Sequence, residues 1–430
     1  MKHLSYQFET SGERLSDEEA SYWKTLLFRS MKIGVELEVC EPPDRERSEV
    51  IRWLKEELKP SKSNRFLGES GVLTVSRELK GLEVKIVGRN PIFDHFTRQI
   101  RRVCRTLLEM GCVPDGACGM HFHLIAAPLL RDLPATVLAN LWTLTRWYGA
   151  PLRYLMSAGS CREALTRRRF FCDHSVLCSK DAAREGILEV KRHLDGGETI
   201  KGHYSFINLE HVVFRGPERI GGLHVEYRFP DMDLVAPSIV AKGYLFVALV
   251  LRAVELSKYG ALELEAGDLE RRLNLLSRLS NNKGEECLSD TSRLDDKDIA
   301  TLSELSHAML KELRSTLTYF EPMVSRVLTY LATNPISSLR SAGNDWLEVE
   351  GIFDELFERR ESDSRLGQKL VEIIELQRHR NYPRRRAWLE ATARALDVSP
   401  VYLKHMLHNM GSSRFPRWDP ELGTMIFSYR

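Results

Sequence analysis

The segment GGLHVEYRFPDMDL, from Gly221 to Leu234, carries a histidine, a glutamate and an arginine at every second position. In an extended strand, alternate side chains point to opposite faces of the sheet. His224, Glu226 and Arg228 therefore share one face, and the apolar residues between them share the other, which is expected to pack in the core. One such strand is common at a solvated sheet surface, so its meaning depends on the other strands.

Three further segments repeat this alternation of charged and apolar residues. They are GVELEV (34–39) with Glu36 and Glu38, GLEVKIV (81–87) with Glu83 and Lys85, and GMHFHL (119–124) with His121 and His123. If the four segments belong to one sheet, its polar face gathers carboxylates that repel one another when ionised. Such a face is either open to water or neutralised by cations.

The residue types on this face favour neutralisation by metal. Carboxylates together with a histidine suit Mg²⁺ or Mn²⁺, which prefer oxygen ligands and often bridge to phosphate groups. Arg228 on the same face would orient or neutralise an anion. In the plainer alternative, each acid decorates a solvated strand and each histidine is an ordinary hydrogen-bonded side chain. The joint occurrence on four strands leads us to predict a metal and phosphate site.

Composition restricts the class of protein. The chain has 430 residues, 43% of them hydrophobic, and a net charge of +2, which is typical of a globular protein of two or three domains and gives no bulk attraction to nucleic acid or membranes. The polar first twenty residues do not resemble a secretory signal. The apolar run from Leu234 to Leu251 is interrupted by Pro237 and Lys242, which favours a buried helix over a membrane span. The scattered cysteines favour reduced thiols, so we expect a cytoplasmic protein without a membrane partner.

Periodicity predicts an α+β protein with a mainly helical C-terminal region. Helical patterns cover residues 45–59, 90–111 and 134–149, and Ser16 is a candidate N-cap for an earlier helix. We divide the chain into a core over 1–255 and a helical region over 256–430. Within the latter, residues 384–410 have the outline of a helix-turn-helix, for which packing or partner docking is the default interpretation and DNA binding the alternative.

At the residues of the polar face, the sequence resembles the amidoligase family of the glutamine synthetase-like carboxylate–amine ligases. CGMHFHL resembles the Gly-Met-His-x-His strand of glutamine synthetases, and VEYRFPDMDL is similar to their Glu-x-Arg-x-Pro-Asp stretch. GVELEV resembles the Glu-x-Glu strand of the superfamily, and HYSFIN (203–208) resembles an Arg/His-Tyr-x-x-x-Asn element of the amidoligase branch. The motifs follow one another in the family's order over about residues 31–251.

The resemblance implies a curved antiparallel sheet that forms a funnel, with helices packed behind it. ATP would enter one end, and two or three Mg²⁺ or Mn²⁺ ions would lie in the middle. The implied reaction phosphorylates a carboxylate substrate to an acyl phosphate, which an amine substrate then attacks to form an amide or isopeptide bond.

The resemblance also implies a role for each residue of the polar face. Glu36, His121 and Glu226 would hold the cation that bridges the ATP phosphates. Glu38 and Glu83 would hold the cation near the carboxylate substrate. His123 would lie near the nucleotide, with Arg153 as a further candidate for nucleotide binding. Arg228, near the transferring phosphoryl group, and Glu226 are the candidate catalytic residues.

Some positions depart from the family's pattern. Pro91 stands where glutamine synthetases carry another metal-binding glutamate, and Lys85 is expected to pair with Glu83 and to weaken metal binding. The segment before GVELEV is short, which favours an amine other than ammonia, such as a peptide or protein amine. Two alternatives stay open: a phosphotransferase on the same scaffold, and a degenerate ligase core that acts as a DNA- or protein-binding module.

Overall fold

The protein is described here by a computed structural model. The described residues are 7–8, 14–59, 71–78, 81–88, 94–114, 118–125, 133–156, 207–208, 224–264, 266–280, 295–320, 322–333, 366–377, 380–409 and 417–426. The HYSFIN element lies outside these residues except for Ile207 and Asn208.

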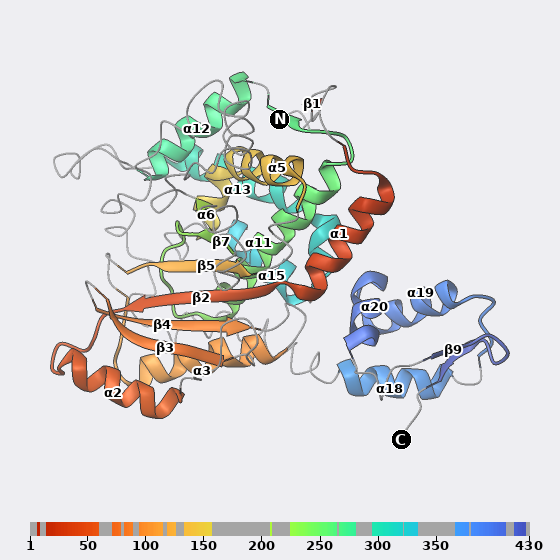
Figure 1. Ribbon diagram of the computed structural model, residues 1–430, viewed down its shortest axis with the longest axis horizontal. Coiled ribbons are helices and arrows are strands. Elements are labelled where there is room, and N and C mark those ends of the chain that lie inside the picture. The colour runs from red at the N-terminus through yellow and green to blue at the C-terminus, as the bar shows by residue number, and fades with distance from the viewer. Residues whose placement is uncertain are drawn as a thin grey trace.

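A six-stranded sheet contains all four of the segments with alternating charge (Figure 1). Across the sheet its strands are β3 (Gly71–Glu78), β4 (Gly81–Gly88), β2 (Lys32–Val39), β5 (Met120–Ile125), β7 (His224–Tyr227) and the two-residue β6 (Ile207–Asn208). Every neighbouring pair is antiparallel. With the helices that follow, this makes the protein α+β, and it confirms the prediction that the four segments form one sheet.

The apolar face of the sheet packs against α11 (Ala236–Leu256). Gly243 lets this helix approach closely, because a Cβ atom there would lie only 3.2 Å from Phe122 Cε1 on β5. One turn away, Phe246 stacks on Tyr227 of β7 with ring centroids 3.9 Å apart. The side chains that alternate with the charged ones therefore build the interface between sheet and helix, as the period of two predicts.

Helix α11 is buried along almost its whole length, which confirms the prediction of a buried helix. The helices that contact it are α1 (Asp17–Ser30), α3 (Asp94–Glu109), α5 (Ala135–Trp147), α14 (Arg314–Leu317) and α15 (Pro322–Thr333). Helix α2 (Arg47–Leu58), together with α3, covers the β3 and β4 side of the sheet (Figure 1). Among the described residues, no helix has the length and apolar character that crossing a membrane requires.

The main hydrophobic core continues past the boundary expected near residue 255. Residues of α12 (Ala266–Ser280), α13 (Asp296–Glu312) and α15 belong to the same buried cluster as the sheet. Helix α13 also contacts α6 (Gly149–Met156), which comes much earlier in the chain. The first helices of the C-terminal region thus complete the core that the sheet begins.

A second, smaller hydrophobic cluster lies near the C-terminus. It is formed by α18 (Leu366–Gln377), α19 (Arg385–Leu396), α20 (Pro400–Asn409) and the hairpin of β9 (Arg417–Asp419) and β10 (Thr424–Ile426). These elements lie together at one side of the molecule (Figure 1).

Within this cluster, α19 and α20 occupy the span with the helix-turn-helix outline. The turn passes through Asp397, which adopts a left-handed conformation with φ of 54°. A contact with the main body follows at once, because Ser399 Oγ donates a hydrogen bond to the carbonyl of Thr318 at 2.8 Å.

Candidate metal centre on the polar face of the sheet

The register of the strands brings the charged residues of the four segments opposite one another. Glu36 pairs with Lys85 on one side and His121 on the other, Glu38 pairs with Glu83, and His123 pairs with Glu226. Residues opposite one another in an antiparallel pair have Cβ atoms about 4.5–5.5 Å apart. Side chains that are distant in sequence therefore form one cluster on the face opposite α11.

The imidazole of His121 lies among three carboxylates. Its Nδ1 is 3.1 Å from Glu36 Oε2 and 3.7 Å from Glu226 Oε1. Its Nε2 is 3.7 Å from Glu38 Oε1. The side chain is only 4% exposed. His121 thus connects the acids of β2 with the acid of β7.

His123 belongs to a group with the composition of a metal site. Its Nε2 is 3.3 Å from Glu36 Oε1. One ligand atom each from Glu36, His123 and Glu226 lie within 4.8 Å of one another. Two carboxylates and an imidazole form a donor set that fits a divalent cation such as Mg²⁺ or Mn²⁺. The sequence motif led us to expect His121 in this group and His123 near a nucleotide. Both histidines lie beside the two acids, since His121 Nδ1 is 3.1 Å from Glu36 and 3.7 Å from Glu226.

Burial and neighbouring charges alter the acids in different ways. Burial alone would raise the pKa of Glu36, but hydrogen bonds from His121 and His123 outweigh it and hold that pKa well below its ordinary value. Burial would likewise raise the pKa of Glu226, and the charges of His123 and Arg228 lower it overall. Both acids of the candidate metal site are therefore held in the ionised form that a cation requires.

The pKa of Glu83 is shifted in the opposite direction. Burial, together with the negative charge of Glu36, raises the pKa of Glu83 to about 7. Lys85 Nζ lies 3.0 Å from Glu83 Oε2 and 2.5 Å from Glu36 Oε1, which confirms the expected pairing of Lys85 with Glu83. Burial would lower the pKa of Lys85, but the charge of Glu36 and the hydrogen bonds to the two acids raise it overall.

The two arginines predicted at the site lie in different surroundings. Arg228 is on the polar face and donates a hydrogen bond to Glu226 Oε1, so its guanidinium lies beside the candidate metal group. Arg153 is in α6 and is 1% exposed. Its guanidinium donates to the Phe229 carbonyl at 3.0 Å and forms an ion pair with Asp231 at 3.0 Å. The structure thus places Arg153 in a buried ion pair and not in the cluster around Glu36.

A second buried ion pair was not anticipated from the sequence. Lys242 Nζ lies 2.6 Å from Asp233 Oδ2, and the two side chains are 0% and 1% exposed. Asp233 also accepts hydrogen bonds from the Val235 N–H and the Ser238 hydroxyl at the start of α11. A lysine inside an apolar helix requires a buried partner, and this signal could have revealed the pair.

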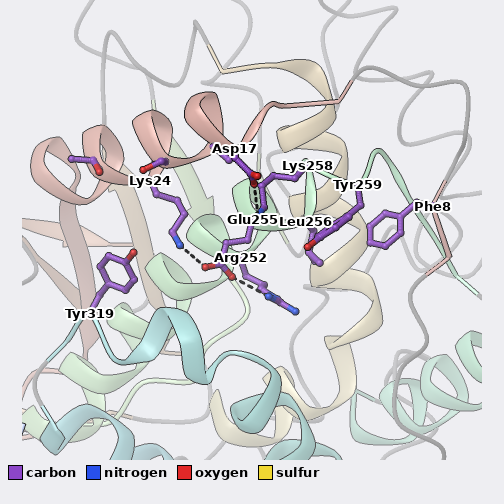
Figure 2. Close-up of a pocket in the computed structure, with 12 residues that line it drawn as sticks. Phe8, Asp17, Lys24, Arg252, Glu255, Leu256, Lys258, Tyr259 and Tyr319 are labelled. Carbon is purple, nitrogen blue, oxygen red and sulfur yellow. Dashed lines mark hydrogen bonds and ion pairs between the residues drawn. The ribbon is translucent and has the colours of Figure 1, made fainter. Parts of the chain in front are cut away.

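A separate pocket of about 420 Å³ lies between α1 and the C-terminal end of α11 (Figure 2). Charged residues form ion pairs there: Glu255 of α11 with Lys24 of α1 and with Arg252, and Asp17 with Lys258, which follows α11. The charges of this pocket are therefore compensated by neighbouring side chains, in contrast to those of the polar face.

Comparison with known proteins does not identify a family for this chain. No protein-family model matches the chain, and no curated protein matches it.

Proposed function

We propose that this protein is an ATP-dependent carboxylate–amine ligase that uses Mg²⁺ or Mn²⁺ and has a glutamine synthetase-like core. The observation that carries the proposal is the convergence of Glu36, His123 and Glu226 within 4.8 Å, from three neighbouring strands. Divalent cations in sites of this composition commonly bridge to the phosphates of a nucleotide. The antiparallel sheet, with helices on one face and acids on the other, supports the proposal, because the resemblance implies an antiparallel sheet with helices packed behind it.

Each residue of the group has a part in this chemistry. Glu36, His123 and Glu226 would hold the cation, and the hydrogen bond with His121 keeps Glu36 ionised and oriented. When bound, the cation would neutralise charge on the nucleotide phosphates. Arg228 beside Glu226 would stabilise the negative charge of the transferring phosphoryl group.

The reaction proceeds in two transfers. A carboxylate oxygen of the first substrate attacks the γ-phosphorus of ATP, and ADP leaves with the electrons of the broken bond. The amine nitrogen of the second substrate then attacks the acyl carbon, inorganic phosphate leaves, and the amine loses a proton as the amide forms. The protein contributes by holding both substrates and the acyl phosphate in one site, where proximity replaces diffusion.

Calorimetric titration with a non-hydrolysable ATP analogue tests the first step. The intact chain is expected to bind the analogue in the presence of Mg²⁺ or Mn²⁺ and to bind it at least about tenfold more weakly without the metal. Glu226→Ala is expected to abolish the metal-dependent part. Glu56→Ala, which removes an exposed acid on α2, is the matched control and is expected to bind like the wild type.

Absence of metal-dependent binding in the wild type would overturn the proposal and would favour the binding-module alternative. If the analogue binds, product analysis with carboxylate substrates separates the two enzymatic alternatives. A ligase yields an amide only when an amine is added, whereas a phosphotransferase releases a phosphorylated product without one.

A further inference from the structure

Lys85 lies among the carboxylates that β2 and β4 place on the polar face. It lies on β4 directly opposite Glu36, and its ammonium contacts Glu36 Oε1 at 2.5 Å and Glu83 Oε2 at 3.0 Å. Glu83 in turn lies directly opposite Glu38 on β2. A single ammonium group therefore bridges carboxylates of two strands, which is the position that a bridging cation would take.

The charges of the face divide into two groups around this ammonium. On β2 and β4, Glu36 and Glu83 contact Lys85, and Glu38 lies opposite Glu83. On β5 and β7, Glu226 is accompanied by Arg228 and by the two histidines. Glu36 belongs to both groups, since it contacts Lys85 with the same oxygen that faces His123.

An ammonium and a divalent cation compete for the same carboxylates. Mg²⁺ binds carboxylate oxygens at about 2.0–2.1 Å and repels a neighbouring positive charge strongly when both are partly buried. Lys85 is 25% exposed and Glu83 is 8% exposed, so water screens this repulsion only in part. A cation coordinated by Glu83 at the oxygen that Lys85 contacts would have to displace the ammonium. Glu36 contacts Lys85 through Oε1, and its Oε2 faces His121.

We propose that Lys85 is a built-in cation that takes the place of a second divalent ion, so that the polar face binds one metal ion, at Glu36, His123 and Glu226. This inference rests on the proposed function for the existence of that first site. It assigns Lys85 a positioning role: the ammonium holds Glu36 and Glu83 and neutralises the acids of β2 and β4. Near Glu83, the carboxylate substrate would then face the single positive charge of Lys85 instead of a divalent ion.

Counting bound Mn²⁺ ions tests the inference without measuring activity. Calorimetry, or the electron paramagnetic resonance signal of free Mn²⁺, gives the number of ions bound per intact chain. We expect one ion for the wild type and two for Lys85→Met, which removes the charge and keeps the length of the side chain. Lys85→Gln provides a second neutral variant if Lys85→Met does not fold, and thermal melting monitors folding of each.

Three controls identify where an additional ion binds. Lys85→Arg keeps the positive charge and is expected to bind the same number of ions as the wild type. The double variant Lys85→Met/Glu83→Gln is expected to lose the ion gained by Lys85→Met. Lys55→Met removes an exposed lysine of α2 and is expected to change nothing.

The outcomes separate this inference from the proposed function. If the folded neutral variants bind no more ions than the wild type, or if the wild type already binds two, Lys85 does not replace a metal ion. A wild type that binds none, with neutral variants that bind one, supports the role of Lys85 but removes the Glu36–His123–Glu226 site. One ion in every variant retains the proposed metal site and overturns the role of Lys85.

Discussion

Two parts of the stretch from His224 to Lys242 differ in how their acidic side chains are neutralised. In β7, Glu226 joins a cluster in which four carboxylates, Glu36, Glu38, Glu83 and Glu226, face the permanent cations Lys85 and Arg228. A few residues later, Asp233 and Lys242 form an almost fully buried pair in which one acid meets one base.

The difference in charge balance distinguishes the proposed metal site from a structural ion pair. Asp231 with Arg153, and Asp233 with Lys242, fix the turn that leads from β7 into α11. Such pairs need no further ion, and breaking one leaves an uncompensated buried charge. The cluster around Glu36 has more acids than permanent cations, so an added cation would complete it.

The largest expected effect is the loss of stability on breaking the buried pair. Asp233→Asn keeps the shape of the side chain and one oxygen, which can accept the hydrogen bond from the Val235 N–H, but it puts a neutral NH2 group in place of the oxygen that accepts from Ser238 and Lys242. We expect the free energy of unfolding to fall by about 3–5 kcal/mol, measured by urea denaturation. Lys242→Met should cost less, since Asp233 keeps its other two donors. Equal stability of Asp233→Asn and the wild type would show that the pair is not a structural element.

Metal is expected to have the next largest effect, confined to the polar face. At a free Mn²⁺ concentration one hundred times the dissociation constant, the free energy of unfolding should rise by about 2.7 kcal/mol in the wild type. Glu226→Gln should show a much smaller increase, and a chelator should reverse the effect in both proteins. A similar increase in Glu226→Gln would place the stabilising ion elsewhere.

The same carboxylate-to-amide change on the polar face should have a small effect on stability. Glu38 Oε2 accepts the Gly119 N–H at 2.6 Å, and the amide oxygen of a glutamine can keep that bond. Because Glu38 also lies opposite Glu83, Glu38→Gln removes a repulsion between acids. We expect the free energy of unfolding to change by less than about 1 kcal/mol in urea denaturation. A loss as large as that of Asp233→Asn would remove the contrast between the two regions.

The smallest expected effect concerns Glu255 at the pocket between α1 and α11. Burial would raise its pKa, but the hydrogen bond and charge of Lys24 and the contacts with Arg252 lower it below the ordinary value of 4.5. A lowered pKa means that the ionised acid stabilises the fold above pH 4.5, and that this contribution is lost as the pH falls through the lowered pKa.

The wild type should therefore exceed Glu255→Gln in stability by less than about 1 kcal/mol near neutral pH, because the pair is partly exposed. The difference should shrink below pH 4.5 in urea denaturation curves measured at several pH values. A difference that grows on acidification would contradict the assignment.

Much of the fold could be predicted because its signals are local. Alternation with a period of two placed β2, β4, β5 and β7 and identified their buried faces. The pattern of apolar residues predicted α3, and Ser16 caps α1 through a reciprocal capping box with Glu19. The interrupted apolar run predicted α11 as a buried helix. Each of these inferences uses only neighbours within a few residues, where backbone geometry determines which side chains share a face.

The candidate site could be predicted only in part. The sequence identified the acids, the histidines and Arg228 as residues of one face, but it could not show which acids each of the two histidines contacts. It also assigned Arg153 to a nucleotide, although the structure pairs it with Asp231. Both questions depend on contacts between segments far apart in the chain.

By itself, then, the sequence determined that four strands carry charge on one face and apolar residues on the other, because a strand repeats every two residues. Only the tertiary structure decided which charges meet. Strand register places Glu226 opposite His123 and places both Lys85 and His121 opposite Glu36, and helix packing buries Lys242 against Asp233. Electrostatic interactions depend on distances of a few ångströms, which are set by the pairing of distant segments and not by the order of residues within one of them.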